Sequence, residues 1–269
     1  MITRAATALA VLLIAAAPLS ARAQGPRIVS LNPCSDAILV EVADPAQIVA
    51  LSAYSRDPAS SSLPPGVAAR YATTHGTLEE VLVLHPDVVV DGAFAAPAMV
   101  GAYHRLGLRL ELLGTQRNVA DALADVRHLA AIAGHPDRGE ALVRRIDAAL
   151  TAAAPPPRRA PVEAVFWEWG GIVAGSDTLI GDLLMRTGFA NLPARQGYHQ
   201  AAIYPIERLL AHPPRVLLTV CDDRMLHHPA LAAVKGMARA DFPAGLLYCG
   251  GPTIMRAAAY LAALHRALG

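Results

Sequence analysis

Aromatic, cysteine and basic side chains follow several apolar segments of this chain, and together they could hold a large ligand. Rings offer rigid apolar area with a polar edge, which suits a planar or chelated ligand. Trp167 and Trp169 lie two positions apart and would share one face of a strand end. Core packing of Trp167, or surface positions for Tyr54 and Tyr198, are the alternatives. The candidate ligand-binding residues are Pro33, Cys34, Ser35, Tyr54, His75, Phe94, Trp167, Trp169, Tyr198 and Arg224.

Common signatures of catalysis are missing from the sequence. It contains no G-x-S-x-G elbow, no H-E-x-x-H motif and no P-loop. Cys34 could act as a nucleophile only with a distant histidine. The chain has 10 histidines, but none show the spacing typical of a metal site. We therefore predict no catalytic residue, no metal site and no cofactor; an exported enzyme is the alternative.

The overall composition excludes two classes of protein. Hydrophobic residues make up 54% of the 269 residues and charged residues 17%, which supplies a large core and excludes a mainly disordered chain. The formal net charge is +1 and no lysine- or arginine-rich run occurs. Without such an electrostatic footprint, we expect no nucleic-acid partner.

The first 23 residues have the organisation of a secretory signal peptide. Arg4 precedes an apolar run, Ala8–Ala17, that is too short to span a bilayer. Ala21–Ala23 then fits an A-x-A cleavage site. We predict a signal peptide at residues 1–23 and export of the remainder as a soluble protein; an uncleaved anchor is the alternative.

Three cysteines leave the pairing open in an exported chain. Cys221 and Cys249 both follow apolar runs that could be neighbouring strands. In that case the two could form a disulfide, and Cys34 would remain unpaired. The alternative is that all three are buried as small apolar side chains.

The predicted elements alternate between strand and helix on both sides of a helical middle, as expected for parallel sheets covered by helices. The first part has expected strands at 27–31, 48–51, 88–91 and 108–112 and helices at 33–42, 77–84 and 95–106. The second part has expected strands at 162–167, 216–220 and 246–248 and helices at 178–187, 205–211 and 253–268. Two helices between them are expected at 118–133 and 137–153, before three consecutive prolines. These patterns divide the chain into residues 24–133, 134–154 and 155–269.

Four segments, in order, resemble the periplasmic substrate-binding proteins of ABC importers for metal chelates. They are 27–36 (R-I-V-S-L-N-P-C-S-D), 78–90 (L-E-E-V-L-V-L-H-P-D-V-V-V), 175–184 (G-S-D-T-L-I-G-D-L-L) and 206–218 (I-E-R-L-L-A-H-P-P-R-V-L-L). The resemblance implies the class III fold of that family. In this α/β fold, two Rossmann-like lobes with parallel sheets are joined by one long rigid helix, here 137–153, and the ligand lies between the lobes.

The resemblance also implies a membrane partner. Glu79 and Glu207 start two similar helix–turn–strand segments and match the glutamates, one per lobe, that dock on arginines of the permease. A carboxylate is favoured at a helix start and can meet a guanidinium through two hydrogen bonds. The implied partners are the permease and ATPase at the inner membrane, and the protein would be a periplasmic monomer. Pro214-Arg215 departs from the Pro-Asp usual in the family.

The resemblance leaves the chelate open between a corrinoid and a ferric siderophore, with haem as the alternative. Haem requires an axial Tyr or His, for which Tyr71 and His75 are the candidates. Haem-binding members have a Gly-Tyr pair where this chain has Arg70-Tyr71, which disfavours haem. A siderophore would require arginines, and those available are Arg56, Arg195 and Arg224.

Overall fold

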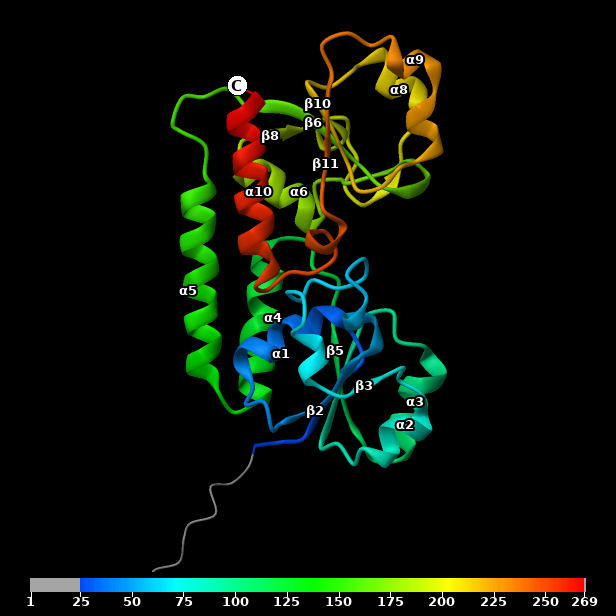
Figure 1. Ribbon diagram of the computed structural model, residues 1–269, viewed down its shortest axis with the longest axis vertical. Coiled ribbons are helices and arrows are strands. Elements are labelled where there is room, and N and C mark those ends of the chain that lie inside the picture. The colour runs from blue at the N-terminus through cyan, green and yellow to red at the C-terminus, as the bar shows by residue number, and fades with distance from the viewer. Residues whose placement is uncertain (1–24, 269) are drawn as a thin grey trace, which may run out of the picture.

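The structure, a computed structural model, describes residues 25–268 as two α/β lobes with three long helices along one side (Figure 1). The signal peptide predicted at residues 1–23 lies outside the described residues. None of the described helices combines the length and apolar character needed to cross a membrane.

The N-terminal lobe contains a five-stranded parallel sheet with the strand order β3-β2-β1-β4-β5. Its central strands are buried on both faces, as expected for a parallel sheet between helices. The strands are β1 (Ile28–Ser30), β2 (Ile48–Ser52), β3 (Thr73–Thr74), β4 (Val88–Gly92) and β5 (Arg109–Leu113). The helices are α1 (Pro33–Val42), α2 (Leu78–Val83) and α3 (Pro97–Arg105), with short 3-10 turns η1 (Ala53–Arg56) and η2 (Ala68–Arg70).

Helix α1 begins and ends where the sequence predicts. The Asn32 side chain accepts a hydrogen bond from the Cys34 amide at 2.8 Å, which caps the helix. Pro33 occupies the first helical position, where its missing N–H costs no hydrogen bond. The start of α1 is therefore held against the end of β1, at the edge of the sheet where a ligand is expected.

The C-terminal lobe has a mixed sheet in which β11, β10, β6 and β8 are parallel, and β7 is antiparallel to β6 and β9. The strands are β6 (Val162–Trp167), β7 (Ile172–Val173), β8 (Phe189–Asn191), β9 (Ala202–Ile203), β10 (Val216–Thr219) and β11 (Ala238–Asp241). The helical elements are η3 (Trp169–Gly171), α6 (Leu179–Arg186), α7 (Leu192–Arg195), α8 (Ile206–Ala211), η4 (Arg224–His227) and α9 (Pro229–Ala232).

The predicted strand at 246–248 is wrong. Leu246 ends a 3-10 turn, η5 (Ala244–Leu246), and the next two residues follow that turn. The last strand is β11, which begins eight positions before Leu246. Pro243 and Gly245 explain the turn, because proline donates no hydrogen bond to a sheet and glycine weakens a strand. The apolar run therefore packs as a loop between β11 and the last helix.

Three long helices lie beside the two sheets, and two of them, α4 and α5, connect the sheets along the chain. The chain leaves β5 through α4 (Val119–Ile132) and α5 (Pro136–Ala153), enters β6, and ends in α10 (Thr253–Leu268). Helix α5 packs against α4, α10 and α1, and it runs along the side of both lobes (Figure 1). One hydrophobic core contains residues from both sheets and all three helices, so the lobes share a continuous apolar interior.

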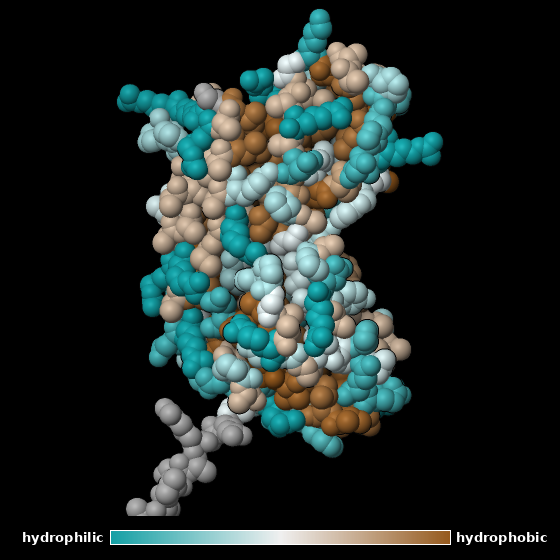
Figure 2. Space-filling view, viewed as in Figure 1, coloured by the Kyte–Doolittle hydropathy of each residue, from teal (hydrophilic) through white to brown (hydrophobic). Residues whose placement is uncertain are grey.

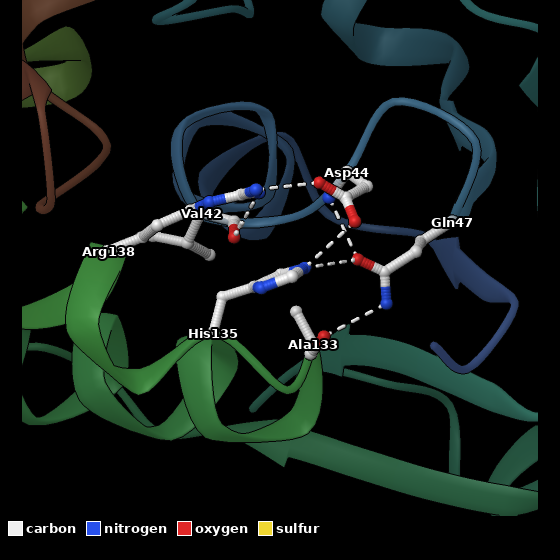
Figure 3. A network of polar contacts seen from close by, with 6 residues as sticks. All are labelled: Val42, Asp44, Gln47, Ala133, His135 and Arg138. Atoms are coloured by element: carbon white, nitrogen blue, oxygen red, sulfur yellow. Dashed lines mark hydrogen bonds and ion pairs between the residues drawn. The ribbon is translucent and has the colours of Figure 1, made fainter. Parts of the chain in front are cut away.

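A polar network attaches the start of α5 to the N-terminal lobe (Figure 3). The Arg138 guanidinium lies 2.7 Å from Asp44 Oδ1, and His135 Nε2 lies 3.1 Å from both Asp44 Oδ2 and Gln47 Oε1. Gln47 Nε2 donates to the Ala133 carbonyl at 2.9 Å. The hydrogen bond from Arg138 is the main cause that lowers the pKa of Asp44. The α4–α5 turn is thus held by charged and polar groups.

Candidate ligand-binding site

A cavity of about 410 Å³ lies between the two lobes. Its floor and walls are loops that follow the carboxyl ends of β1, β4, β5 and β6, which is where open α/β sheets bind ligands. The molecular surface is hollowed between the lobes on the side away from α5 (Figure 2). The lining residues are Asn32–Cys34, Gly92–Phe94, Leu113–Gln116, Glu168, Thr178–Ile180, Leu247 and Tyr248.

The cavity is apolar with one acidic side chain. Glu168 is half-buried, and this burial raises the pKa of its carboxyl. Among residues 25–268, no hydrogen bond reaches that carboxylate. Burial, together with the nearby Glu168 charge, raises the pKa of the Tyr248 phenol. No lysine, arginine or histidine is among the lining residues, so the site offers a carboxylate and a phenol without a compensating cation.

Behind this cavity, a buried carboxylate ties η1 to α1. Asp36 Oδ2 accepts hydrogen bonds from Ser55 Oγ at 2.5 Å and from the Ser52 amide at 3.0 Å. Its Oδ1 atom is buried without a partner among the described residues. Desolvation outweighs these hydrogen bonds and raises the pKa of Asp36 to about 7. The position of η1 therefore depends on a group that titrates near neutral pH.

Three of the predicted ligand-binding residues line the cavity. Pro33 and Cys34 begin α1, and Phe94 follows β4. The Phe94 side chain is 92% exposed, which places an apolar ring at the cavity without any protein packing around it. An exposed ring beside a concave site is available to cover a ligand.

The two tryptophans do not share a face. Trp167 is 0% exposed in the core, and its indole N–H donates to Asp223 Oδ2 at 3.1 Å. Trp169 is 51% exposed in η3. The strand ends at Trp167, and Gly170 and Gly171 have positive φ angles of 68° and 78°, so the strand alternation does not continue. Neither tryptophan lines the cavity.

The other five predicted residues also lie outside the cavity. Ser35 is buried and donates to the Asn32 carbonyl at 2.8 Å, and Tyr54 is 65% exposed in η1. His75 is exposed, with Nδ1 3.7 Å from Glu80 Oε1. Tyr198 packs on Tyr204 and the Arg208 guanidinium, whereas Arg224 is exposed in η4.

The sequence-based prediction missed several residues that the fold brings to the cavity. Glu168 directly follows β6, and its place after a predicted strand was the available signal. Gln116 lies in the loop that follows β5, three residues after Leu113. Tyr248 could not be found, because residues 246–248 were expected inside a strand.

Neither alternative left open for the cysteines is found, because Cys221 and Cys249 are not paired and the three are not all unpaired. The disulfide joins Cys34 to Cys249, with the Cα atoms 4.9 Å apart, and Cys221 is half-buried and unpaired among the described residues. The prediction required two adjacent strands. The chain after β11 instead crosses to the N-terminal lobe, which brings Cys249 to the start of α1.

Glu79 and Glu207 occupy equivalent positions in the two lobes. Each is the second residue of a short helix, α2 or α8, and each is exposed. Both helices lie on the side of the molecule opposite α5 (Figure 1). Thr77 Oγ1 accepts a hydrogen bond from the Glu80 amide and so caps α2, and the Glu80 carboxylate accepts from Thr74 Oγ1 and the His75 amide.

No group of three or more His, Cys, Asp or Glu side chains in residues 25–268 is placed to hold a metal ion. The cavity instead presents apolar walls and isolated polar groups.

Comparisons with known proteins identify solved structures that share this fold. No curated protein matches the chain. The periplasmic haem-binding protein of Pseudomonas aeruginosa is 20% identical, with a TM-score of 0.71, covering 89% of this chain and 92% of that chain. The periplasmic vitamin B12-binding protein of Vibrio cholerae is 17% identical, with a TM-score of 0.67 and coverages of 90% and 98%. CeuE of Helicobacter pylori with Ni(II) bound is 15% identical, with a TM-score of 0.70 and coverages of 91% and 85%.

These structures share the fold of this chain, with two α/β lobes and the class III arrangement that the sequence predicts. Residues 28–241, which include both sheets, match a family of binding proteins. The chain is therefore a member of the periplasmic binding protein family.

Proposed function

We propose that this protein is the substrate-binding component of an ABC importer and captures a metal chelate between its lobes. The observation that carries the proposal is the cavity, which residues of both lobes line at the carboxyl ends of the strands. We further propose export to the periplasm by residues 1–23, lobes at residues 24–133 and 155–269, and a bridging segment at 134–154. The chelate is released unchanged, without a catalytic residue or a resident cofactor.

The charge of the side chains that line the cavity favours uncharged ligands over anionic ones. Glu168 is the one ionisable acid of the lining, and no basic side chain accompanies it. A carboxylate in a partly desolvated site repels a negatively charged ligand and leaves a neutral one unaffected. We therefore favour a corrinoid or an uncharged ferric siderophore over a ferric catecholate, a ferric carboxylate or haem with its propionates.

Within the cavity, we propose that the Phe94 and Tyr248 rings contact the ligand from opposite lobes. Phe94 projects from the N-terminal lobe, and Tyr248 comes from the segment before α10. Of the residues predicted from sequence, Pro33 and Cys34 complete this contact surface. Glu168 adds a polar group that could accept a hydrogen bond from a side-chain amide of a corrinoid.

A titration panel tests the proposal. The purified mature chain is titrated with cyanocobalamin, an uncharged ferric hydroxamate, a ferric catecholate and haemin, with quenching of tryptophan fluorescence as the readout. We expect saturable binding of cyanocobalamin or the hydroxamate. Phe94→Ala weakens that binding about tenfold, whereas Tyr54→Ala, an exposed ring outside the cavity, leaves it unchanged. Failure of all four probes to bind would reject the chelate class.

We also propose that Glu79 and Glu207 dock the loaded protein on the permease. Both carboxylates are exposed and unpaired among the described residues, and both lie on the side opposite α5. Each could meet an arginine of the permease through two hydrogen bonds. The permease would then work with its ATPase at the inner membrane, and the binding protein would act as a monomer.

Charge reversal tests the docking surface. The double variant Glu79→Lys/Glu207→Lys should abolish chelate uptake by cells and retain the affinity of the purified protein. Asp137→Lys is a matched control, because Asp137 is also an exposed acid in the first turn of a helix but lies on α5. Uptake that survives the double reversal would refute the docking role.

A further inference from the structure

A segment of the C-terminal lobe crosses to the N-terminal lobe beside the cavity. Residues 243–252 connect β11 to α10, and Figure 1 shows this chain descending to the region of α1 and α4 before α10 returns. Leu247 and Tyr248 in its middle line the ligand cavity. We call residues 243–252 the bridge segment.

Two glycines bring the bridge segment into close contact with the N-terminal lobe. A Cβ atom at Gly250 would lie 2.6 Å from the Ala122 Cβ, and one at Gly251 would lie 2.7 Å from Ile38 Cγ1. Gly251 also has a φ of +58°, which side-chain-bearing residues rarely adopt. The backbone of the bridge segment therefore rests directly on α1 and α4, with no room for side chains between them.

Hydrogen bonds fix the same contact. The Gly250 amide donates to Gln116 Oε1 at 2.8 Å, and Gln116 Nε2 donates to Asp125 Oδ2 at 2.7 Å. Hydrogen bonds to both its oxygen and its nitrogen therefore fix the orientation of the Gln116 side-chain amide. At the start of α10, the Arg256 guanidinium donates to the Ser62 carbonyl of the N-terminal lobe.

A disulfide also joins the bridge segment to the N-terminal lobe, at the wall of the cavity. Cys249 is 2% exposed and follows Tyr248, and its partner Cys34 lines the cavity at the start of α1. The bond joins positions 215 residues apart in sequence and therefore links the two lobes covalently. It attaches the wall that carries Leu247 and Tyr248 to the wall that carries Pro33.

We propose that the Cys34–Cys249 disulfide is a positioning element of the binding site, which holds Leu247 and Tyr248 in place for the ligand. The proposal rests on the proposed chelate-binding function. Without the bond, the bridge segment would be attached by its hydrogen bonds and backbone contacts alone. Ligand binding would then have to order the segment, and a site that is ordered in advance binds more tightly.

Removing either half of the bond should have the same effect as removing both. In a cyanocobalamin titration, Cys34→Ser, Cys249→Ser and the double variant should each weaken affinity about tenfold. Equal losses are expected because the two sulfurs act as one unit. Cys221→Ser is the matched control, because Cys221 is outside the bond and outside the cavity; it should bind like the wild type.

A double-mutant cycle separates positioning from general destabilisation. Tyr248→Ala should weaken binding in the disulfide-bonded protein and have a markedly smaller effect in Cys34→Ser/Cys249→Ser, where Tyr248 is already misplaced. Hydrogen exchange supplies a readout without ligand. Amides at 244–251 should exchange at least about tenfold faster in the double variant under conditions where its circular dichroism remains native, whereas amides of β6 and β10 should change only as far as the global free energy of unfolding does.

The outcomes are distinct. Unchanged affinity in the double variant, or a full Tyr248→Ala effect in it, would overturn the positioning role. If the wild type binds none of the four chelates, the proposed function fails, and hydrogen exchange alone decides the inference. In that case, exchange of the bridge segment that speeds up through local opening, beyond the change in global stability that β6 and β10 report, supports positioning of the cavity wall by the disulfide. Exchange there that changes no more than global stability requires refutes it.

Discussion

Two contacts that hold the N-terminal lobe to the rest of the molecule differ in chemistry. At the start of α5, Asp44, His135 and Arg138 form a network whose side chains are between 26% and 48% exposed. At the bridge segment, a disulfide with a buried cysteine and two closely packed glycines make the contact. Exposed ion pairs stabilise by about 1 kcal/mol or less, whereas a disulfide typically contributes about 2–4 kcal/mol.

The difference shows which attachment shapes the binding site. The α5 network orients a long helix, and none of its side chains line the cavity. The bridge segment supplies two cavity residues and lies within the wall itself. We therefore expect changes at the bridge segment to alter stability and ligand affinity together, and changes at the α5 network to have small effects on both.

The largest effect should come from opening the disulfide. Cys249→Ala should lower the free energy of unfolding by about 2–5 kcal/mol, because the bond closes a very long loop and the unfolded chain gains conformational entropy when it is lost. Urea denaturation monitored by circular dichroism measures this change. Cys221→Ser provides the baseline, and a loss no larger than that baseline would contradict the importance of the bridge segment.

The next largest effect on the free energy of unfolding should come from the titration of Asp36, which lies on the same helix as Cys34. Its folded-state pKa of about 7 lies above the ordinary value of 3.8, so the folded protein holds this proton more tightly than the unfolded chain. The stabilisation from this group is complete below about pH 4 and is lost as the pH rises to about 7. Over that window, it amounts to roughly 4 kcal/mol at most.

Asp36→Asn isolates this contribution. The unfolding free energy of the wild type should fall relative to that of the variant as the pH rises from 4 to 7. Above that range, the difference between the two should remain constant. Denaturation at several pH values in that range measures it. A difference that does not vary with pH would show that the Asp36 carboxyl titrates normally.

Close packing at the bridge segment predicts a loss of stability that is smaller than that from opening the disulfide and larger than that from the α5 network. Gly251→Ala should destabilise by about 1–3 kcal/mol, because the new methyl group would collide with Ile38 in addition to the strained backbone. Gly107→Ala is the matched control, since Gly107 has a φ of +70° with open space around it. Equal losses in thermal melts of the two variants would mean that backbone strain alone accounts for the effect.

The α5 network should contribute least. Arg138→Ala should lower the free energy of unfolding by about 1 kcal/mol or less, and the loss should shrink in 0.5 M salt because the ion pair with Asp44 is partly exposed. Chelate affinity should stay within about twofold of the wild type. A loss comparable with that of Cys249→Ala would reverse the comparison between the two attachments.

Local sequence signals predicted the elements that position the site. The predicted helix at 33–42 matches α1, whose Asn32 and Pro33 are typical of a helix start, and the predicted strands at 88–91 and 216–220 match β4 and β10, which are aliphatic runs after a proline. Strand β11 was missed because its sequence, Ala-Arg-Ala-Asp, has only small apolar residues. Its position is set by pairing with β10, a tertiary contact that no local pattern encodes.

The site was predicted less completely than the fold, for the same reason. Phe94 and Cys34 could be identified because they directly follow strands or start a helix. Trp167 was misplaced, because burial depends on where a strand ends and two glycines turn the chain after it. The pairing of Cys34 with Cys249 and the presence of Tyr248 in the cavity depend on the bridge segment crossing between lobes, which requires the assembled structure.

The most direct test is the charge selectivity of the cavity. The wild type, Glu168→Gln and Glu163→Gln are each titrated to equilibrium with cyanocobalamin and with a ferric catecholate. Glu168 lies in the cavity just after β6, and Glu163 lies near the start of β6, outside the cavity. The wild type should prefer cyanocobalamin. Glu168→Gln should raise catecholate affinity at least about tenfold, since two like unit charges closer than about 12 Å repel by more than about 1.4 kcal/mol at an effective dielectric constant of about 20. Glu163→Gln should change nothing. A wild type that prefers the catecholate, with Glu168→Gln unchanged, would contradict binding in this cavity.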